Sequence, residues 1–244
     1  MRFDYDTIAD SYDDYRTGAG PYLGTLVTLA ESASARRVLE VGSGTGNSAR
    51  AFLERYPCDF IGLDVSWRML AKAKIKGVAN RWVQASAMDL PVADECVDYV
   101  FGCYVLHHIE DFERMIRESA RVIGSGCAAF VTASHEFIEG YPMNTYFPSF
   151  AKIDRARFPS VERVRAALEA AGFRETGIEK RTAPPRIIDR AYADRVAAKF
   201  ISTYAVMPDD EFEAGLKRLY ADLEPEGRLD MRIIREATII WATK

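Results

Sequence analysis

The chain has 244 residues, of which 48% are hydrophobic and 28% are charged, a balance typical of a globular protein with a sizeable core. This composition excludes a disordered, collagen-like or coiled-coil chain. No apolar run approaches the roughly 20 residues that a membrane span needs. No apolar segment follows a basic start, so we expect no signal peptide either.

The net charge of -4 argues against a nucleic-acid partner, because a phosphate-binding surface shows a basic excess. Residues 151–244 nevertheless hold 18 Lys and Arg against 16 Asp and Glu, a net of +2, which leaves -6 for residues 1–150. This basic bias either suits an anionic substrate or is solvated surface. The four cysteines are widely spaced and include no C-x-x-C pair, so we expect no zinc site, no disulfide framework and a reducing, cytoplasmic location.

Apolar, β-branched segments alternate with helical patterns along the chain. The predicted strands are residues 37–41, 60–64, 81–85, 97–104, 127–132, 173–179 and 236–242. The predicted helices between them are residues 48–56, 67–76, 112–122 and 161–171. Asp111 and Ser160 are expected to cap the last two of these helices. This order predicts an α/β fold, a doubly wound, Rossmann-like sheet of seven mostly parallel strands in a single domain, residues 1–244.

Two segments do not fit the alternation. Residues 135–158 are dense in aromatic side chains and contain proline, and residues 182–235 contain two predicted helices, at 189–204 and 209–223. We interpret both segments as helical insertions that cap the edge of the sheet where substrate binds. The aromatic stretch has two interpretations, a lid over an apolar or aromatic acceptor and the core of the insertion itself.

The strongest local signal is Glu40-Val41-Gly42-Ser43-Gly44-Thr45-Gly46, between a predicted strand and a predicted helix. Glycines at alternate positions let the backbone turn sharply and let a ligand approach the main chain. The loop lacks the lysine of a P-loop, which argues against a triphosphate. It also departs from the dinucleotide pattern G-x-G-x-x-G, because Asn47 occupies the position of the last glycine.

Asp64 lies twenty residues after Gly44, at the end of the next predicted strand. A carboxylate there can accept both hydroxyls of a ribose. It can equally cap the helix that begins near Trp67. Combined with the glycine loop, Asp64 favours a nucleoside ligand.

These motifs make the chain resemble the class I S-adenosylmethionine-dependent methyltransferases of the small-molecule type, similar to methyltransferase type 11. The resemblance covers residues 3–134 well and is faint afterwards. The segments that carry it are residues 8–13, 38–46, 62–66, 69–70, 90–91, 97–100, 105–109 and 121–123.

The resemblance implies S-adenosylmethionine as cofactor and in-line transfer of its methyl group to a small-molecule acceptor, with no metal. It places the three loop glycines against the methionine part of the cofactor and Asp64 on the ribose. Glu40 would hold the cofactor's amino group, directly or through water, and Tyr104 would approach the methyl group. The full set of implied cofactor residues is Tyr12, Arg16, Glu40, Gly42, Ser43, Gly44, Gly46, Asp64, Val65, Met69, Ser86, Ala87, Met88 and Tyr104. The family often has Asp where this chain has Ser86, a departure that weakens the adenine contact.

A catalytic residue is not indicated by any triad or nucleophile-base spacing. His107, His108 and His135 follow strands at the predicted ligand edge, so each is a candidate base or substrate contact. Alternatively, these histidines form hydrogen bonds within their own loops and take no part in catalysis. Three other functions stay open: an NAD-dependent oxidoreductase, a protein that binds S-adenosylmethionine without turnover, and transfer of the cofactor's aminopropyl or a modified methyl group. The oligomeric state is not indicated.

Overall fold

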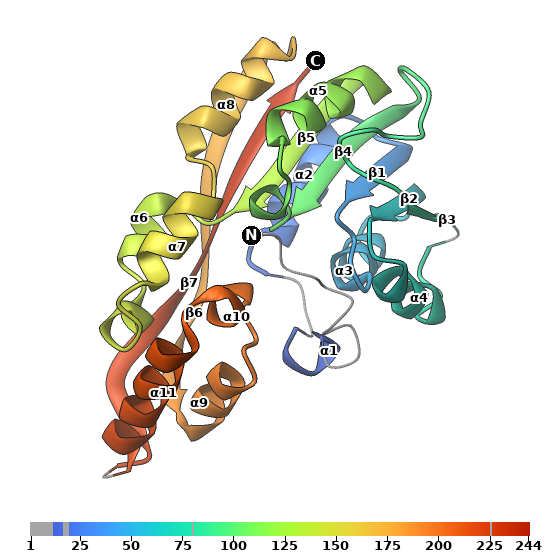
Figure 1. Ribbon diagram of the computed structural model, residues 1–244. Helices are drawn as coiled ribbons and strands as arrows, with labels where there is room; N and C mark the ends of the chain where they lie inside the picture. Colours follow the sequence, from blue (N-terminus) through green and yellow to red (C-terminus); the bar gives the residue numbers. More distant parts are fainter. Residues whose placement is uncertain (1–11, 17–19, 80, 225) are drawn as a thin grey trace.

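The computed structural model describes residues 12–16, 20–79, 81–224 and 226–244. These residues form a mixed sheet in the order β3-β2-β1-β4-β5-β7-β6 (Figure 1). The strands are β1 (Arg37–Val41), β2 (Asp59–Asp64), β3 (Arg81–Gln84), β4 (Val97–Cys103), β5 (Ile123–Thr132), β6 (Glu175–Asp189) and β7 (Arg228–Thr243). Strands β1 to β5 pair in parallel, whereas β7 runs antiparallel to both β5 and β6. The predicted doubly wound, mostly parallel sheet is confirmed.

Helices cover both faces of this sheet, because successive strand residues point to opposite sides. Val38 of β1 packs in one core with helices α2 and α3, and the next residue, Leu39, packs in the other with α5 and α8. The helices along the sheet are α2 (Leu23–Ser32), α3 (Asn47–Leu53), α4 (Trp67–Ile75), α5 (Phe112–Val122) and α8 (Val161–Ala170). The side chains of Asp111 and Ser160 cap α5 and α8 as predicted, each accepting a backbone N–H three residues on.

The strand order creates the site where a ligand is expected. The chain moves from β1 outward to β2 and β3 and then returns to place β4 on the other side of β1. Connections after β1 and β4 therefore diverge, and a crevice opens outside the carboxyl ends of these strands. The glycine loop after β1, Asp64 at the end of β2 and Tyr104 after β4 all lie at this edge.

The last two strands are much longer than predicted, so residues 182–235 contain strand as well as the predicted helices. Strands β6 and β7 pair from Glu175 opposite Thr243 to Asp189 opposite Arg228. Pro184 and Pro185, which suggest a loop, fall in a register shift between Ala183 and Arg186. Proline has no N–H for the ladder and is tolerated at such an irregularity of an edge strand.

The predicted helix at 189–204 is two helices, α9 (Arg190–Ala197) and α10 (Ser202–Val206). Lys199, with a φ of +49°, ends the first of them. Its ammonium lies 3.3 Å from a carboxylate oxygen of Asp209 and 4.5 Å from the ring centre of Phe212. The predicted helix at 209–223 is confirmed as α11 (Asp209–Leu223).

Residues 135–158 and the outer part of the β6–β7 hairpin with its helices, residues 182–235, come together in space (Figure 1). We call these two segments the cap. The first contributes α6 (His135–Glu139), the 3-10 helix η3 (Pro142–Thr145) and α7 (Phe150–Arg157). The two segments share one hydrophobic core, in which Phe147 contacts Tyr204 and Phe212 with ring centres 5.2 and 5.9 Å apart. Segments far apart in the sequence therefore stabilise each other.

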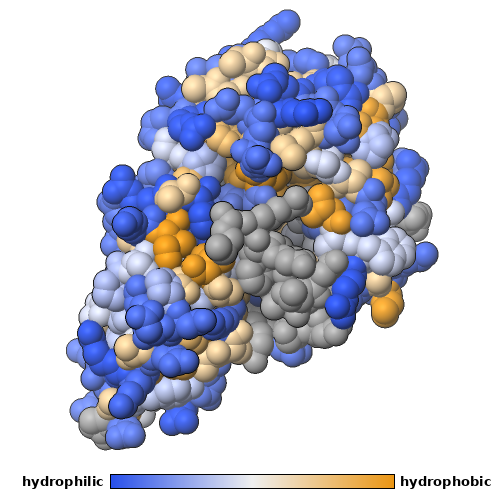
Figure 2. Space-filling model, in the orientation of Figure 1, coloured by the Kyte–Doolittle hydropathy of each residue, from blue (hydrophilic) through white to orange (hydrophobic). Residues whose placement is uncertain are grey.

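Figure 2 shows a largely hydrophilic face, with apolar side chains gathered where the cap meets the rest of the molecule. No helix within the described ranges is long and apolar enough to cross a membrane.

Replacement of Phe147, which is fully buried in the cap core, tests whether the cap is one unit. We expect Phe147→Ala to lower the free energy of unfolding by about 3–5 kcal/mol, because it removes a large buried ring. Phe147→Leu, the control, should cost clearly less. Hydrogen exchange should show loss of protection in α7 and α11 together. Loss in only one of these helices would contradict a shared core.

Candidate functional site

The loop between β1 and α3 has left-handed backbone at three glycines, Gly42, Gly44 and Gly46, with φ of +71°, +52° and +77°. A Cβ at Gly42 would lie 2.3 Å from a methyl carbon of Val105, so only glycine fits there. At Gly44 the nearest atom to such a Cβ is the Met69 Cε, 3.6 Å away. The free side of Gly44 faces a cavity, as a site for close approach of a ligand requires.

Gly46 has a different role from the one expected. A Cβ there would lie 2.9 Å from the Trp82 ring and 3.1 Å from the Ala73 Cβ. Gly46 is the residue before α3 and is not among the residues that line the cavity. It allows α3 to pack closely on its neighbours.

Asp64 connects the two strand-to-helix turns. Its Oδ2 accepts a hydrogen bond from the Gly44 N–H at 2.8 Å, and its Oδ1 accepts one from the Ser66 N–H at 2.9 Å. The cap of α4 is Ser66, whose Oγ accepts from the Met69 N–H, so Asp64 is not the helix cap. A carboxylate oxygen can accept more than one hydrogen bond, and Asp64 lines the cavity.

Glu40 is fully buried beneath the glycine loop and does not itself line the cavity. Its Oε1 accepts a hydrogen bond from the Ser48 hydroxyl, and Ser48 does line the cavity. The second carboxylate oxygen, Oε2, has no hydrogen-bond partner among the described residues. Burial raises the pKa of Glu40 to about 8, although hydrogen bonds from Ser48 and Ser43 oppose the shift.

Asp13 ends the opening segment of the resemblance and is not among the predicted site residues. It attaches helix α1 (Tyr12–Tyr15) to the glycine loop. Its carboxylate accepts hydrogen bonds from Thr45 and Asn47 and pairs with Lys76 at 2.8 Å. The Lys76 ammonium also donates to the Thr45 carbonyl at 2.7 Å. Burial alone would raise the pKa of Asp13, but these hydrogen bonds hold it below its ordinary value.

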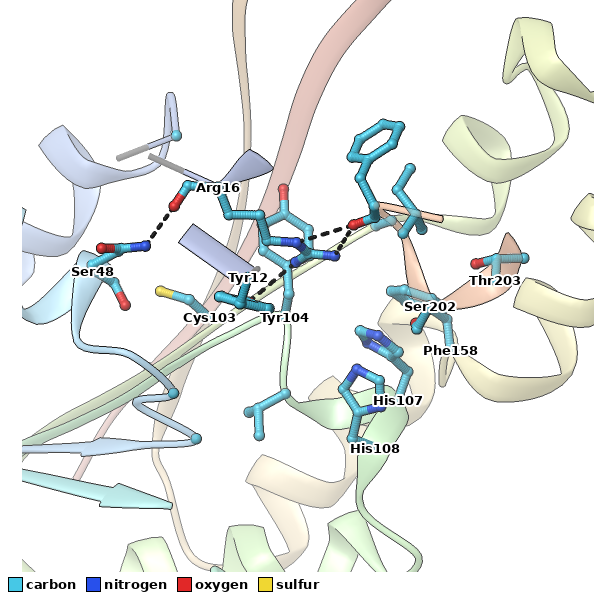
Figure 3. A pocket seen from close by; sticks show the side chains of 18 of the residues that line it. Tyr12, Arg16, Ser48, Cys103, Tyr104, His107, His108, Phe158, Ser202 and Thr203 are labelled. Atoms are coloured by element: carbon cyan, nitrogen blue, oxygen red, sulfur yellow. Dashed lines mark hydrogen bonds between the residues drawn. The ribbon is translucent and has the colours of Figure 1, made fainter. Parts of the chain in front are cut away.

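This attachment places Tyr12 and Arg16 over the cavity. Figure 3 shows the Arg16 guanidinium above the Tyr12 ring, and its carbon is 5.1 Å from the ring centre. Arg16 also donates to the Phe200 carbonyl from Nη2 at 3.0 Å. The N-terminal helix and the cap therefore meet across the cavity. Residues 8–11 of the expected opening motif lie outside the described residues.

Tyr104, directly after β4, has a φ of +52°, which is unusual for a residue with a Cβ. Its N–H donates to the Val131 carbonyl at 2.8 Å, and this bond fixes the turn. Tyr104 lines the cavity opposite the glycine loop, as do Ser86, Ala87 and Met88 after β3. The Ser86 hydroxyl accepts from the Met88 N–H at 3.1 Å.

The three candidate histidines separate into two groups. His107 and His108, in the 3-10 helix η2 (Leu106–His108), line the cavity. The His107 ring stacks on Phe158 and contacts the His108 ring at a tilt (Figure 3). Burial, then repulsion from His108 and Arg157, lowers the pKa of His107 well below its ordinary value. His107 is therefore a neutral ring with a buried Nδ1 that has no hydrogen-bond partner in the described part of the chain. His135 lies outside the cavity lining, with its Nε2 2.9 Å from the Phe158 carbonyl oxygen.

These residues surround one cavity of about 890 Å³ that continues from the glycine loop into the cap. Twelve of the fourteen expected cofactor residues line it, and Glu40 and Gly46 do not. The cap contributes aromatic side chains to the cavity wall. It also contributes a group of arginines, which the sequence did not single out for this site. Among the residues that the structure describes, no cluster of His, Cys, Asp or Glu could hold a metal ion.

Comparison with known proteins shows what part of the chain resembles. Residues 39–131, which span most of β1 to β5 with the glycine loop, match the family model of the methyltransferase domain. This segment is therefore similar to methyltransferases, the resemblance that the sequence motifs indicate. The matched segment ends before the cap, so this match says nothing of the cap's ligand.

Curated relatives match part of the chain. The uncharacterized methyltransferase YcgJ of Bacillus subtilis is 36% identical over 121 residues, covering 47% of each chain. The demethylmenaquinone methyltransferase of Thermus thermophilus is 32% identical over 105 residues, covering 41% of this chain and 48% of that one. The present chain thus spans about half the length of the curated relatives that it matches.

A solved structure resembles nearly the whole chain. A protein of Anabaena variabilis, described as a methyltransferase from an antibiotic biosynthesis pathway, has a TM-score of 0.77. The match covers 94% of this chain and 99% of that one at 19% sequence identity. At this identity the likeness shows a shared fold, cap included, and says nothing of a shared acceptor.

Asp64→Ala tests the assignment of the cofactor site. We expect calorimetry to show S-adenosylhomocysteine binding weakened by about 1–3 kcal/mol, because the variant removes a charged hydrogen-bond acceptor. Asp59→Ala is the matched control, since Asp59 begins the same strand and pairs with Arg81 at the surface. Equal affinity in the two variants would refute the ribose assignment.

Glu40→Gln tests the buried carboxyl through pH. Because the pKa of Glu40 in the folded protein is about 8, above its ordinary value of 4.5, the folded state keeps a proton that the unfolded state loses. The wild type should therefore lose stability relative to Glu40→Gln as the pH rises from 4.5 toward 8. Urea unfolding across this range measures the difference. A difference that is independent of pH would show that Glu40 is ionised throughout.

Proposed function

We propose that this chain transfers a methyl group from S-adenosylmethionine to a small-molecule acceptor by in-line displacement. The observation that carries the proposal is the cavity, whose one end is lined by the glycine loop and Asp64 and whose other end is lined by the cap. When bound, S-adenosylmethionine supplies a methyl group on a positively charged sulfur, already activated for transfer.

The residues at the first end fit this cofactor. The open side of Gly44 leaves room for a ligand against the backbone, where any larger residue would project. Asp64 lines the cavity with a carboxylate that can take ribose hydroxyls in addition to its two backbone donors. The Glu40 Oε2 is a buried acceptor without a partner among the described atoms, next to Ser48 at the cavity wall. We assign the amino group of the cofactor to Ser48 and Glu40 acting together.

The remaining assignments follow from position in the cavity. Tyr12 and Arg16 cover the end of the cofactor that carries its carboxylate, where the guanidinium supplies a complementary charge. Val65, Met69 and residues 86–88 surround the base, and Tyr104 lies at the transfer end. His107 lacks the basicity to remove a proton from a weakly acidic group, so we assign it a packing role.

We interpret the cap as the acceptor-binding part of a single domain that includes the whole chain. Its cavity wall contains Phe137, Tyr141, Phe150, Phe158 and Phe200, which exclude water and favour a ligand with apolar surface. A protein that binds the cofactor without turnover would be expected to have this space blocked. The continuous cavity favours an enzyme instead.

One experiment distinguishes methyl transfer from an oxidoreductase activity and from the transfer of another cofactor group. The protein is incubated with methyl-labelled S-adenosylmethionine and a metabolite extract, and labelled products are identified by mass spectrometry. We expect a labelled small molecule, greatly reduced with Asp64→Ala, and calorimetric binding of S-adenosylhomocysteine in preference to NAD. Binding of S-adenosylhomocysteine with no labelled product from any extract would favour a non-catalytic role.

A further inference from the structure

Two arginines, Arg186 and Arg195, line the cap end of the cavity. Arg186 lies on the outer part of β6, just after the irregularity at the two prolines, and Arg195 lies on α9, which follows that strand directly. Both side chains are partly buried. The Arg195 guanidinium also packs over the Phe200 ring at 4.6 Å, so it is held at the cavity wall.

The two positive charges are close enough to oppose each other. Burial lowers the pKa of Arg195, and the charge of Arg186 is the next largest cause, with Arg16 contributing in the same direction. Like charges in a partly buried wall raise the free energy of the empty site. An anion placed between them would relieve this repulsion and gain two charge-assisted interactions.

Two described carboxylates of the cap are already engaged. Asp194, next to Arg195 on α9, pairs with Arg190. Arg186 has no ion pair with any described residue. Asp154, which also lines the cavity, pairs with Arg157 at 3.4 Å and accepts a hydrogen bond from Thr203 at 2.7 Å.

Glu236 and Arg235 belong to the opposite end of the acceptor space. Burial is the main cause that raises the pKa of Tyr104, and the charges of Glu236 and Arg235 add smaller, opposing contributions. Both residues are therefore near Tyr104, at the proposed transfer end. Ile233, which is opposite Arg186 in the hairpin, is three residues from Glu236, or about 10 Å of strand. The cap end and the transfer end are thus a small molecule's length apart.

Two tyrosines add a hydrogen-bond donor beside the arginines. The hydroxyl oxygens of Tyr141 and Tyr192 are 2.6 Å apart, and both residues line the cavity. Burial raises the pKa of both phenols, so both are protonated at neutral pH. One hydroxyl donates to the other, which leaves the second proton of the pair to donate to a ligand. Arginine provides a planar pair of N–H groups that matches the two oxygens of a carboxylate or phosphate.

We propose that the methyl acceptor carries an anionic group, a carboxylate or a phosphate, that Arg186 and Arg195 bind beside the Tyr141–Tyr192 pair. The anion fixes one end of the acceptor in the cap, and the opposite end reaches toward Tyr104, where the methyl group is transferred. That the ligand is the acceptor rests on the proposed function. The anion site itself stands on the arginines and tyrosines alone.

Calorimetry with simple aromatic probes tests the site. Benzoate, phenyl phosphate and uncharged benzyl alcohol are titrated into protein saturated with S-adenosylhomocysteine, because the cavity wall is aromatic. We expect at least one of the two anions to bind at least tenfold more tightly than benzyl alcohol. Arg186→Gln and Arg195→Gln should each weaken that anion at least tenfold while S-adenosylhomocysteine affinity stays within twofold. Arg232→Gln, on an exposed residue of the same hairpin outside the cavity, should change neither.

The contrary results distinguish failure of the anion site from failure of the proposed function. Failure of both anions and of inorganic phosphate to bind, or unchanged anion affinity in the Arg186 variant, would overturn the site. Weaker S-adenosylhomocysteine binding in both arginine variants would assign these arginines to the cofactor and also overturn it. If the wild type does not bind S-adenosylhomocysteine, the proposed function fails, and the anion titrations on the protein alone still decide the anion site. Arg186 is on an edge strand, so its variant decides the matter if Arg195→Gln does not fold.

Discussion

The hydrogen bonds that Asp64 accepts from the backbones of Gly44 and Ser66 organise the whole site. Strands β1 and β2 pair in parallel, so the turns that follow them emerge at the same edge of the sheet. The Ser43 N–H also donates to the Leu63 carbonyl, which extends this pairing into the turn. A single carboxylate thus sets the conformation of the glycine loop and faces the cavity that the loop surrounds. The same side chain serves backbone structure and ligand recognition.

The cap depends on a second constraint, the continuation of the β6–β7 ladder beyond the rest of the sheet. The five parallel strands end at the ligand edge, whereas this hairpin continues past it and carries α9, α10 and α11 (Figure 1). Residues 135–158 pack against its outer part in a shared core. The cap is thereby attached to the same sheet that forms the cofactor end. This construction keeps both ends of the cavity in a fixed relation.

The sequence predicts the parallel half of the fold well because its signals are local. Buried strands there are short apolar runs, and the capping side chains of Asp111 and Ser160 stand where the pattern requires them. The extended hairpin was not predictable in this way, since Pro184 and Pro185 indicate a loop and only the pairing with β7 shows the irregularity that accommodates them. No glycine or proline in the sequence indicates the break between the two helices at Lys199. Its ammonium contacts Asp209 and Phe212, ten or more residues away, which no local pattern contains.

In the candidate site, too, local sequence patterns predict some features, and contacts between distant residues determine the others. The positions of Gly44, Asp64 and Tyr104 at the cavity follow from the motif and the strand order. The link from Asp13 to Lys76 joins residues more than sixty positions apart, and no local pattern contains it. Gly46 belongs to the same motif but serves packing against Trp82, which only the three-dimensional arrangement reveals. Arg186 and Arg195 look like ordinary surface charge until the hairpin and α9 bring them together.

The hydrogen bond from Arg16 to the Phe200 carbonyl connects two walls of the cavity. Phe200 lines the cavity from the cap, and Arg16 belongs to the segment that Asp13 attaches to the glycine loop. Neither segment can move at this point without disturbing the wall that the other forms.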